Sequence, residues 1–393
     1  MRRITERLKI VEKHVNEGIT TIMIIGLGSV GAYLLDYLIS LNDSSLRIVV
    51  VGRNQEKMET KVNIIRVAGT IRKLNKTPII IEANVDLNDI DRLQETIEKY
   101  APDFIVNSSR AYSGLKYGSI SWNKIRAYGI WTPLAMHFTK NIMEACERAQ
   151  SNAIVINTSY SDAVNPWLKS AGKAYPDFGS GNLNHLIPRI EYAVADMLNI
   201  DDFWNIDVVI ATGHYHDVCI SKEGHAEGVE VPMKIFYEGK EILLSQKEIF
   251  EKCKILMPTD ATRNMMNASS NYHIITSILQ TIRTQKNERF FSPGALGELG
   301  GYPVIIGYRD NAIDAWIDES VFSLMEMNDS NKQSMYLDGI ANVANGKLSY
   351  SDELLKKCMH SFGVKLPETV SFDEADQVAE FIIDNIIKPQ VGF

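Results

Sequence analysis

Short apolar runs alternate with longer amphipathic segments over the first 165 residues of the chain. The apolar runs have the length of buried strands, and the segments between them repeat apolar residues with the period of a helix. This alternation predicts a parallel, doubly wound sheet with helices on both of its faces. Strands are expected at 21–25, 47–51, 78–82, 103–107 and 153–157, and helices within 1–18 and at about 29–41, 54–74, 89–100 and 131–149.

The pattern changes after residue 165, where helical segments and short strands are mixed, as in an α+β domain. The glycine-rich stretch from Ser292 to Pro303 is expected to connect two strands of a hairpin. Further strands are expected at 206–210, 229–232 and 233–237, and the last helices at 352–361 and 372–388. The chain is therefore predicted to divide into 1–165, 166–345 and a helical extension at 346–393.

A glycine motif, Gly26-Leu27-Gly28-Ser29-Val30-Gly31, lies between the first strand and the first long helix. In a Rossmann sheet, such a motif allows a tight turn, a close approach of the backbone to a pyrophosphate, and close packing of helix on strand. The helix N-terminus adds free N–H groups for the phosphates. Together, the motif and its position predict a dinucleotide-binding Rossmann domain.

The second strand ends on Gly52-Arg53, where NAD-specific proteins usually place a carboxylate for the ribose 2′-hydroxyl. An arginine removes the repulsion of a 2′-phosphate and can donate two hydrogen bonds to it. Asn54 and Lys57 are expected to assist, so the sequence favours NADP(H) as cofactor. The alternative is that Arg53 stacks on the adenine and the site accepts either nucleotide.

Polar residues also end the later strands of the predicted sheet. Asn107, Ser108 and Ser109 are expected beside a ribose, and Asn157 near the nicotinamide ring, because ligands of such sheets bind at the carboxyl ends of the strands. A polar, aromatic loop follows Ser109 and is either a cover over the site or a surface loop. Its Tyr112-Ser113-Gly114-Leu115-Lys116 spells the Tyr-x-x-x-Lys of short-chain reductases, but Gly114 disfavours the helix that this motif needs.

The composition excludes several other classes of function. A net charge of −8 over 393 residues argues against binding to nucleic acid. No apolar run approaches the length of a membrane span, and no signal peptide is indicated, so a cytoplasmic protein acting on a small molecule is expected. The four cysteines form no CxxC pair, and neither a disulfide framework nor a metal site is predicted.

The order of elements after Asn157 resembles the lactate/malate dehydrogenase family. A glycine-rich segment at 179–184 is followed by Arg189 on a helix, and the strand at 206–210 leads into Gly213-His214-Tyr215-His216-Asp217. The resemblance covers about residues 20–345 and rests on order and spacing. It implies a Rossmann domain followed by an α+β catalytic domain, with a homodimer or homotetramer expected. The family aspartate that holds the catalytic histidine is replaced by Leu186.

The resemblance implies a histidine as the acid/base, either His216 or His214, and Arg189 as the anchor of a substrate anion. Asp217 stands beside the histidines and is a candidate to orient one of them in place of the missing aspartate. Alternatives are a surface arginine at 189 and a metal held by the two histidines, for which no nearby Cys or Glu cluster is apparent. The candidate substrate-binding residues are Arg126, Asn182, His185 and Asn267.

The expected function is an NADP(H)-dependent oxidoreductase that transfers hydride between the nicotinamide and a small carbonyl or hydroxy compound similar to a 2-oxo acid. One alternative is an opine- or saccharopine-type reductase acting on an imine. Another is a hydrolase similar to the family 4 glycosidases, which use NAD and a divalent metal bound by a Cys–His pair; Cys219 beside His216 is a loose match. The last alternative is a non-catalytic protein that senses a dinucleotide.

Overall fold

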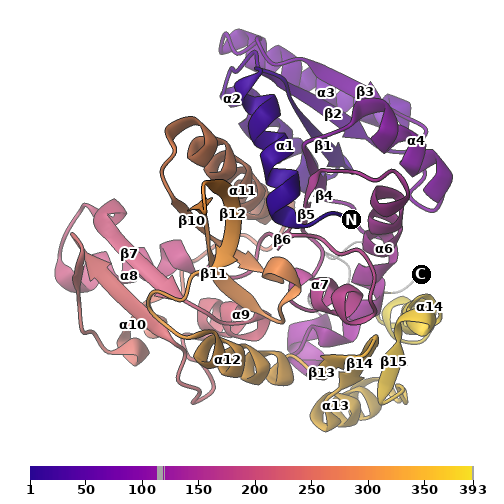
Figure 1. Ribbon diagram of the computed structural model, residues 1–393. Coiled ribbons are helices and arrows are strands. Elements are labelled where there is room, and N and C mark those ends of the chain that lie inside the picture. Colours follow the sequence, from indigo (N-terminus) through magenta and orange to yellow (C-terminus); the bar gives the residue numbers. More distant parts are fainter. Residues whose placement is uncertain (113–117, 119, 392–393) are drawn as a thin grey trace.

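A six-stranded parallel sheet forms the core of the N-terminal half of the protein, in a computed structural model that describes residues 1–112, 118 and 120–391 (Figure 1). The strand order is β3-β2-β1-β4-β5-β6, which confirms the predicted doubly wound sheet. The five strands expected from the sequence are all present, and a sixth follows residue 165. Their bounds are β1 Thr20–Ile25, β2 Leu46–Val51, β3 Ile79–Glu82, β4 Phe104–Asn107, β5 Ile154–Asn157 and β6 Phe178–Gly179.

Both faces of this sheet are buried, as the apolar composition of its strands predicts. Along β1, Ile22 and Ile24 join one hydrophobic cluster, and Met23 and Ile25 join another on the opposite face. This is the alternation that the strand geometry requires. Helices α1 (Ile4–Asn16), α2 (Ser29–Ser40) and α3 (Gln55–Ile71) contribute to the first cluster, and α4 (Ile90–Tyr100) and α6 (Thr132–Arg148) to the second.

The middle of the chain is an α+β region built on two antiparallel sheets. The predicted hairpin connection at 292–303 is confirmed, because β10 and β11 pair across it. The strands are β7 Ile206–Ile210, β8 Met233–Tyr237, β9 Lys240–Glu241, β10 Glu288–Pro293, β11 Gly301–Arg309 and β12 Ala312–Ile317. The helices are α7 Ser161–Ser170, α8 Ile187–Leu198, α9 His214–Glu223, α10 Gln246–Lys252, α11 Asn264–Thr284 and α12 Leu324–Leu337.

Two local predictions in this region are wrong. Residues 229–232 are not a strand; β8 instead pairs with β7 and β9. Residues 213–217, expected as a turn after the strand at 206–210, are helical from His214, where α9 begins. Residues two apart on a helix point in different directions, so His214 and His216 do not share a face as they would on a strand.

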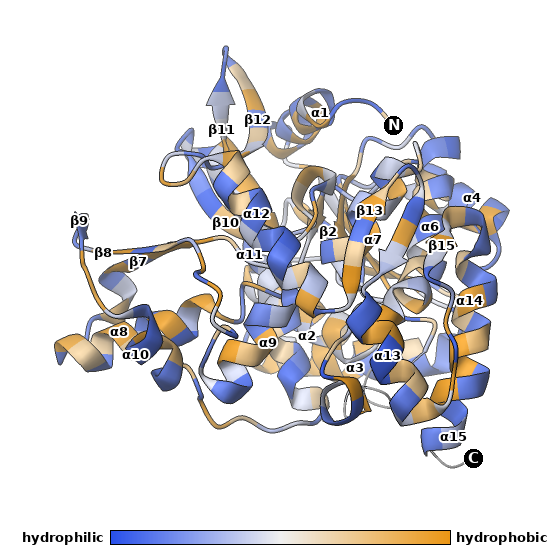
Figure 2. Ribbon diagram, turned by 90° about the horizontal axis from the view of Figure 1, so that it is seen from below, coloured by the Kyte–Doolittle hydropathy of each residue, from blue (hydrophilic) through white to orange (hydrophobic). Residues whose placement is uncertain are grey.

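The C-terminal part adds the predicted helices and also a small antiparallel sheet. Helix α14 packs on α6, and both α4 and α14 carry blue and orange segments in Figure 2, as amphipathic helices do. The elements are β13 Ile340–Ala344, β14 Lys347–Tyr350, α13 Asp352–Phe362, β15 Thr369–Ser371, α14 Ala375–Ile382 and α15 Lys388–Val391. No helix in the described part of the chain has the length and apolar character needed to cross a bilayer.

Short 3₁₀- and π-helical turns connect several of these elements. A π-helical turn at Ser121–Ile125 and a 3₁₀ turn at Gly129–Trp131 lead into α6, within the segment expected as a cover or surface loop. The Tyr112–Lys116 motif lies outside the described residues, apart from Tyr112 itself. Other turns are Phe203–Asn205, Ala261–Arg263, Ala295–Gly297, Phe372–Glu374 and Ile383–Ile387.

Candidate active site

A cavity of about 700 Å³ lies at the carboxyl ends of β1, β2 and β4. This is the edge of a doubly wound sheet at which ligands bind. Of the residues that the sequence predicts to bind a cofactor, nine line the cavity. These are Gly26, Leu27, Gly28, Gly52, Arg53, Asn54, Lys57, Ser108 and Ser109. Other lining residues include Met58, Lys61, Val85, Leu87, Arg110 and Phe138.

The three glycines of the motif serve three different geometric needs. Gly26 turns the chain away from β1 with a φ of +89°, which a side chain would strain. A Cβ at Gly31 would lie 2.2 Å from the carbonyl oxygen of Gly26, so only glycine lets helix α2 pack there. A Cβ at Gly28 would meet nothing within 4 Å, which leaves the backbone at the start of α2 open to a ligand. This cradle fits a pyrophosphate.

The remaining motif residues support the turn. The Ser29 hydroxyl accepts a hydrogen bond from the Asn264 amide at 2.6 Å, and Val30 packs in the adjoining hydrophobic cluster. Ser108 donates to the carbonyl oxygen of Gly26 at 2.6 Å and so ties the end of β4 to the glycine turn. The motif therefore combines a ligand-facing backbone with side chains that hold its shape.

Positive side chains surround the end of β2. Arg53 is two-thirds exposed, and its guanidinium lies 4.0 Å from Asp86. Asn54 caps helix α3 by accepting from the backbone N–H of Lys57 at 2.9 Å. Lys61, which the sequence reasoning missed, donates to the carbonyl oxygen of Leu27 at 2.8 Å. The signal for it is its spacing, four residues after Lys57 and on the same face of α3.

Asn107 and Asn157 form a buried network beneath the cavity. The Asn107 amide donates to Asn157 Oδ1 at 3.1 Å, and Asn157 Oδ1 also accepts from the backbone N–H of Ser159. Asn107 Oδ1 accepts from the backbone N–H and hydroxyl of Ser109. Both asparagines thus shape the loops after β4 and β5, and a direct contact of either with a nicotinamide stays a prediction.

A second, smaller cavity of about 180 Å³ adjoins the first, since Arg110 lines both. It holds His214 together with three of the four predicted substrate-binding residues, Asn182, His185 and Asn267. Its other lining residues are Gly118, Tyr128, Trp131, Ala135, Thr158, Ser159, Tyr160 and Ser180. The two cavities together provide room for a cofactor and for a small substrate beside it.

His214 begins helix α9 and is bound to a carboxylate that sequence reasoning missed. Its Nδ1 lies 2.8 Å from Oδ2 of the buried Asp338, which also binds the Tyr160 hydroxyl and the backbone N–H of Tyr128. Burial alone lowers the pKa of His214, but the charge and hydrogen bond of Asp338, with Asp162, raise it above its ordinary value. The bond through Nδ1 leaves Nε2 for the cavity.

His216 and Asp217 point elsewhere. His216 is buried against the Thr212 hydroxyl at 2.9 Å, and burial lowers its pKa to about 4, so it is neutral. Asp217 lies 3.8 Å from His185 Nδ1, and burial raises its pKa to about 6. The carboxylate that contacts His214 is therefore Asp338 and not Asp217. Burial also lowers the pKa of His185, to about 3.

The two arginines expected to meet a substrate bind protein groups instead. Arg189 is buried and donates to the carbonyl oxygen of Cys253 at 2.9 Å. Arg126 makes ion pairs with Glu223 and Glu227. Neither is among the residues that line the two cavities. Arg110 lines both cavities, and it directly follows the polar end of β4 at Asn107, Ser108 and Ser109.

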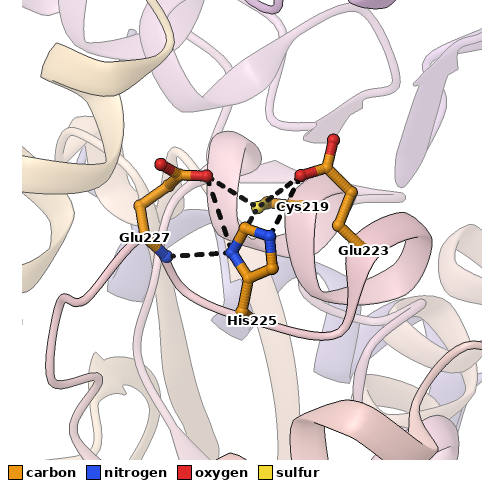
Figure 3. A group of neighbouring side chains, drawn as sticks. All are labelled: Cys219, Glu223, His225 and Glu227. Carbon is orange, nitrogen blue, oxygen red and sulfur yellow. Dashed lines mark hydrogen bonds and ion pairs between the residues drawn. The ribbon is translucent and has the colours of Figure 1, made fainter.

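A cluster of possible metal ligands that the sequence did not suggest lies further along α9, and it does not include His214 or His216. Cys219, Glu223, His225 and Glu227 bring their ligand atoms within 4.8 Å of one another at the end of α9 (Figure 3). We call these four residues the Cys219 cluster. His214 and His216 are not part of it, so the structure does not join the two histidines in a metal site.

The N-terminal domain matches a known family model. Residues 22–119 match the model described as "Saccharopine dehydrogenase NADP binding domain". The match covers β1 to β4 and the glycine motif, and so agrees with the cradle seen in the structure. No curated protein sequence gives a significant match to this chain.

Solved structures match a larger part of the chain. Malate dehydrogenase of Cryptosporidium parvum aligns with 81% of this chain and 98% of its own, at 16% identity and a TM-score of 0.52. This chain has the fold of the malate and lactate dehydrogenases. Lactate dehydrogenase of the same organism (15% identity, TM-score 0.52, 81% and 97% covered) and malate dehydrogenase of Aeropyrum pernix (14%, 0.51, 81% and 97%) agree.

Proposed function

We propose that the protein is an NADP(H)-dependent oxidoreductase that reduces a small carbonyl compound, or oxidises the corresponding alcohol. The observation that carries this proposal is His214, which lines a small cavity directly beside the nucleotide cleft and is held there by the buried Asp338. Support also comes from the family model matched by residues 22–119 and from the lactate dehydrogenase of similar fold, whose structure holds lactic acid and nicotinamide adenine dinucleotide.

The residues of the larger cavity suit the binding of a phosphorylated dinucleotide. Gly28 and the first N–H groups of α2 would hold the pyrophosphate, and Arg53 with Lys57 would hold a 2′-phosphate. When bound, the nucleotide supplies or accepts the hydride. The open, positively charged end of β2 is what favours the 2′-phosphorylated form, because a phosphate gains charge-assisted hydrogen bonds there.

His214 would move the proton that accompanies the hydride. As negative charge develops on the substrate oxygen, the imidazolium Nε2 gives its proton to that oxygen, and in the reverse direction Nε2 takes it back. Asp338 holds Nδ1 and stabilises the charged ring, while Tyr160 and the Tyr128 backbone fix Asp338. Arg110 supplies positive charge for an anionic group of the substrate, and Asn182 and Asn267 supply amide hydrogen bonds.

A second candidate is the reduction of an imine formed from a 2-oxo acid and an amine. The family model matched at residues 22–119, whose description names saccharopine dehydrogenase, favours it. The same residues would serve, since Nε2 would protonate nitrogen in place of oxygen. The two candidates differ in whether an amine is needed for turnover.

Oxidation of NADPH by the purified full chain, followed by absorbance, tests the proposal. A panel of small 2-oxo acids is offered with and without ammonium and amino acids. Turnover without an amine supports carbonyl reduction, and turnover that requires one supports imine reduction. His214→Gln is expected to lower turnover by about 10²–10⁴-fold while leaving NADPH binding intact. Tight NADPH binding without turnover of any compound would contradict the proposed enzymatic activity and would favour a non-catalytic nucleotide sensor.

A further inference from the structure

The Cys219 cluster gathers a thiol, an imidazole and two carboxylates where helix α9 ends (Figure 3). Cys219 is buried and Glu223 is partly buried, whereas Glu227 and His225 are exposed, His225 with about half of its side chain. In Figure 3 both carboxylates point toward the space between the sulfur and the imidazole. The cluster lies at the opposite end of α9 from His214. None of its four residues lines either cavity of the candidate active site.

The local sequence explains why these four side chains converge. Cys219 and Glu223 are one helical turn apart and therefore share a face of α9. Gly224 ends the helix with a φ of +78°, and Glu227 and Gly228 follow with φ of +50° and +77°. These left-handed residues fold the chain back on the helix end, which brings His225 and Glu227 over Cys219.

The separations between the donor atoms are close to those of a metal shell. Cys219 Sγ lies 3.7 Å from His225 Nδ1, 3.8 Å from Glu227 Oε1 and 3.9 Å from Glu223 Oε2. Nδ1 of His225 lies 3.5 Å from Glu227 Oε1. A tetrahedral zinc site has ligand-to-ligand separations of about 3.3–3.6 Å, from its usual bond lengths. These four separations exceed that range by at most a few tenths of an ångström, and the whole set lies within 4.8 Å, so the widest pair would close by up to about 1.5 Å around an ion as Arg126 moves aside.

We propose that Cys219, Glu223, His225 and Glu227 form a zinc site. A thiolate with an imidazole selects zinc over magnesium or calcium, which take oxygen ligands. Because the protein supplies all four positions, the ion would be structural and would have no open position for a substrate. On binding, Zn²⁺ takes the thiolate of Cys219 and the thiol proton goes to solvent.

Arg126 already places a positive charge in the cluster. Its Nη2 donates to Glu223 and to Glu227 and lies 3.5 Å from Cys219 Sγ, so it contacts three of the four proposed ligands. A metal ion would take the position of this nitrogen, and the two cations compete. The guanidinium can keep its second contact, from Nε to Glu223 Oε1 at 3.2 Å. Two carboxylates and a thiolate carry three negative charges, which Zn²⁺ and a neighbouring Arg126 balance.

Titration of the full chain with Co²⁺ tests the site, because a Co²⁺ thiolate bond gives a charge-transfer absorption band. The band is expected to saturate at one ion per chain and to disappear in Cys219→Ser. The matched control is Cys358→Ser, a buried cysteine in α13, which should keep the band. No band in the unaltered protein, or a band retained in Cys219→Ser, would overturn the proposal.

Two further variants keep the test decisive if Cys219→Ser fails to fold. His225→Asn alters a half-exposed side chain and should weaken zinc binding at least about tenfold, measured by competition with a chromophoric chelator. Arg126→Leu should strengthen zinc binding, because it removes the competing cation. Unchanged affinity in His225→Asn, or weaker binding in Arg126→Leu, would contradict the site as proposed. Neither readout depends on enzymatic activity.

Discussion

Nδ1 of His214 lies 2.8 Å from Oδ2 of Asp338, although 124 residues separate the two in the sequence. Both side chains are buried, and Asp338 accepts two further hydrogen bonds, from Tyr160 and from the backbone of Tyr128. A carboxylate held in this way fixes the tautomer and the orientation of the imidazole. The pair therefore leaves Nε2 as the ring nitrogen of His214 that is free for the small cavity.

Asp338→Asn should lower kcat/KM for the proposed reduction by about 10³–10⁴-fold, because an amide no longer fixes the reactive tautomer of His214. NADPH binding should stay unchanged, since Asp338 does not line the nucleotide cleft. Steady-state kinetics and fluorescence titration with NADPH measure the two effects.

The matched control is Asp217→Asn. Asp217 is also buried and close to His214 in the sequence, but it does not hydrogen bond to the imidazole. Its substitution should cost less than about tenfold in kcat/KM. If kcat/KM falls more in Asp217→Asn than in Asp338→Asn, Asp217 orients the histidine, as the sequence suggested, and the assignment to Asp338 is wrong.

The pH profile of the proposed reduction should depend on His214. The proton donor is the imidazolium, so kcat/KM should be highest at low pH and fall as the pH rises through the pKa of His214. Asp338, with Asp162 and Asp217 nearby, raises that pKa above its usual value near 6.5. Asp338→Asn should move this limb of the profile to lower pH. A limb that does not move would contradict the assignment of the titrating group to this pair.

Local patterns in the sequence were enough to predict the Rossmann half of the fold. The first five strands of the central sheet are apolar runs, and the alternation of strands with helices predicts that they pair in parallel. The two-residue β6 has no such run and was not predicted. Gly26 and Gly31 could be assigned because their roles depend on atoms that are near in the motif. The start of α9 was misjudged because Gly213 ends an apolar strand, and nothing local distinguishes a helix N-terminus there from a turn.

The His214–Asp338 contact could not be predicted in the same way. Asp338 caps the end of α12 and reaches His214 only through tertiary packing, so no spacing in the sequence marks it. Arg126 and Arg189 were chosen by their distance along the chain, but carboxylates at the end of α9 bind Arg126, and backbone carbonyls bind Arg189. A charged side chain whose position in the sequence places it near a site can still hydrogen bond to other protein groups once the chain folds, so sequence distance alone does not identify a substrate contact.

Arg53→Asp should change the cofactor preference. The substitution removes a phosphate donor and introduces a carboxylate that repels a 2′-phosphate and can bind a ribose hydroxyl. NADPH affinity is expected to fall by about 10–100-fold, in line with the loss of charge-assisted hydrogen bonds, and NADH affinity to rise. Isothermal titration with both nucleotides gives the ratio.

Arg66→Asp is the control for the change in net charge. It lies on the same helix, α3, and it is not among the residues that line the nucleotide cavity. Its effect on the NADPH to NADH ratio should be small. Unchanged NADPH affinity in Arg53→Asp would show that Arg53 does not read the 2′-phosphate.

Asp376 should link the C-terminal helices to the Rossmann domain in a pH-dependent way. Hydrogen bonds from His137, at 2.9 Å, and from Lys140 lower the pKa of Asp376 to about 2. A carboxyl with a lowered folded-state pKa stabilises the fold above its unfolded pKa near 3.8, and this contribution disappears as the pH falls toward 2. Asp376→Asn should therefore lower the free energy of unfolding at pH 7 by about 1 kcal/mol, after allowance for solvent screening of a side chain that is 40% exposed.

Urea unfolding at pH 7 and near pH 2 measures this difference for the unaltered protein and for Asp376→Asn. At pH 7 the variant should be the less stable of the two, and near pH 2 the curves should approach each other. Asp373→Asn, an exposed carboxylate three residues earlier, should change stability much less at either pH. Helix α14 packs on α6. If the substitution loosens only the C-terminal helices from α6, the urea curve should show a separate transition at lower urea concentration. An equal loss at both pH values would mean that Asp376 acts through packing and not through its charge.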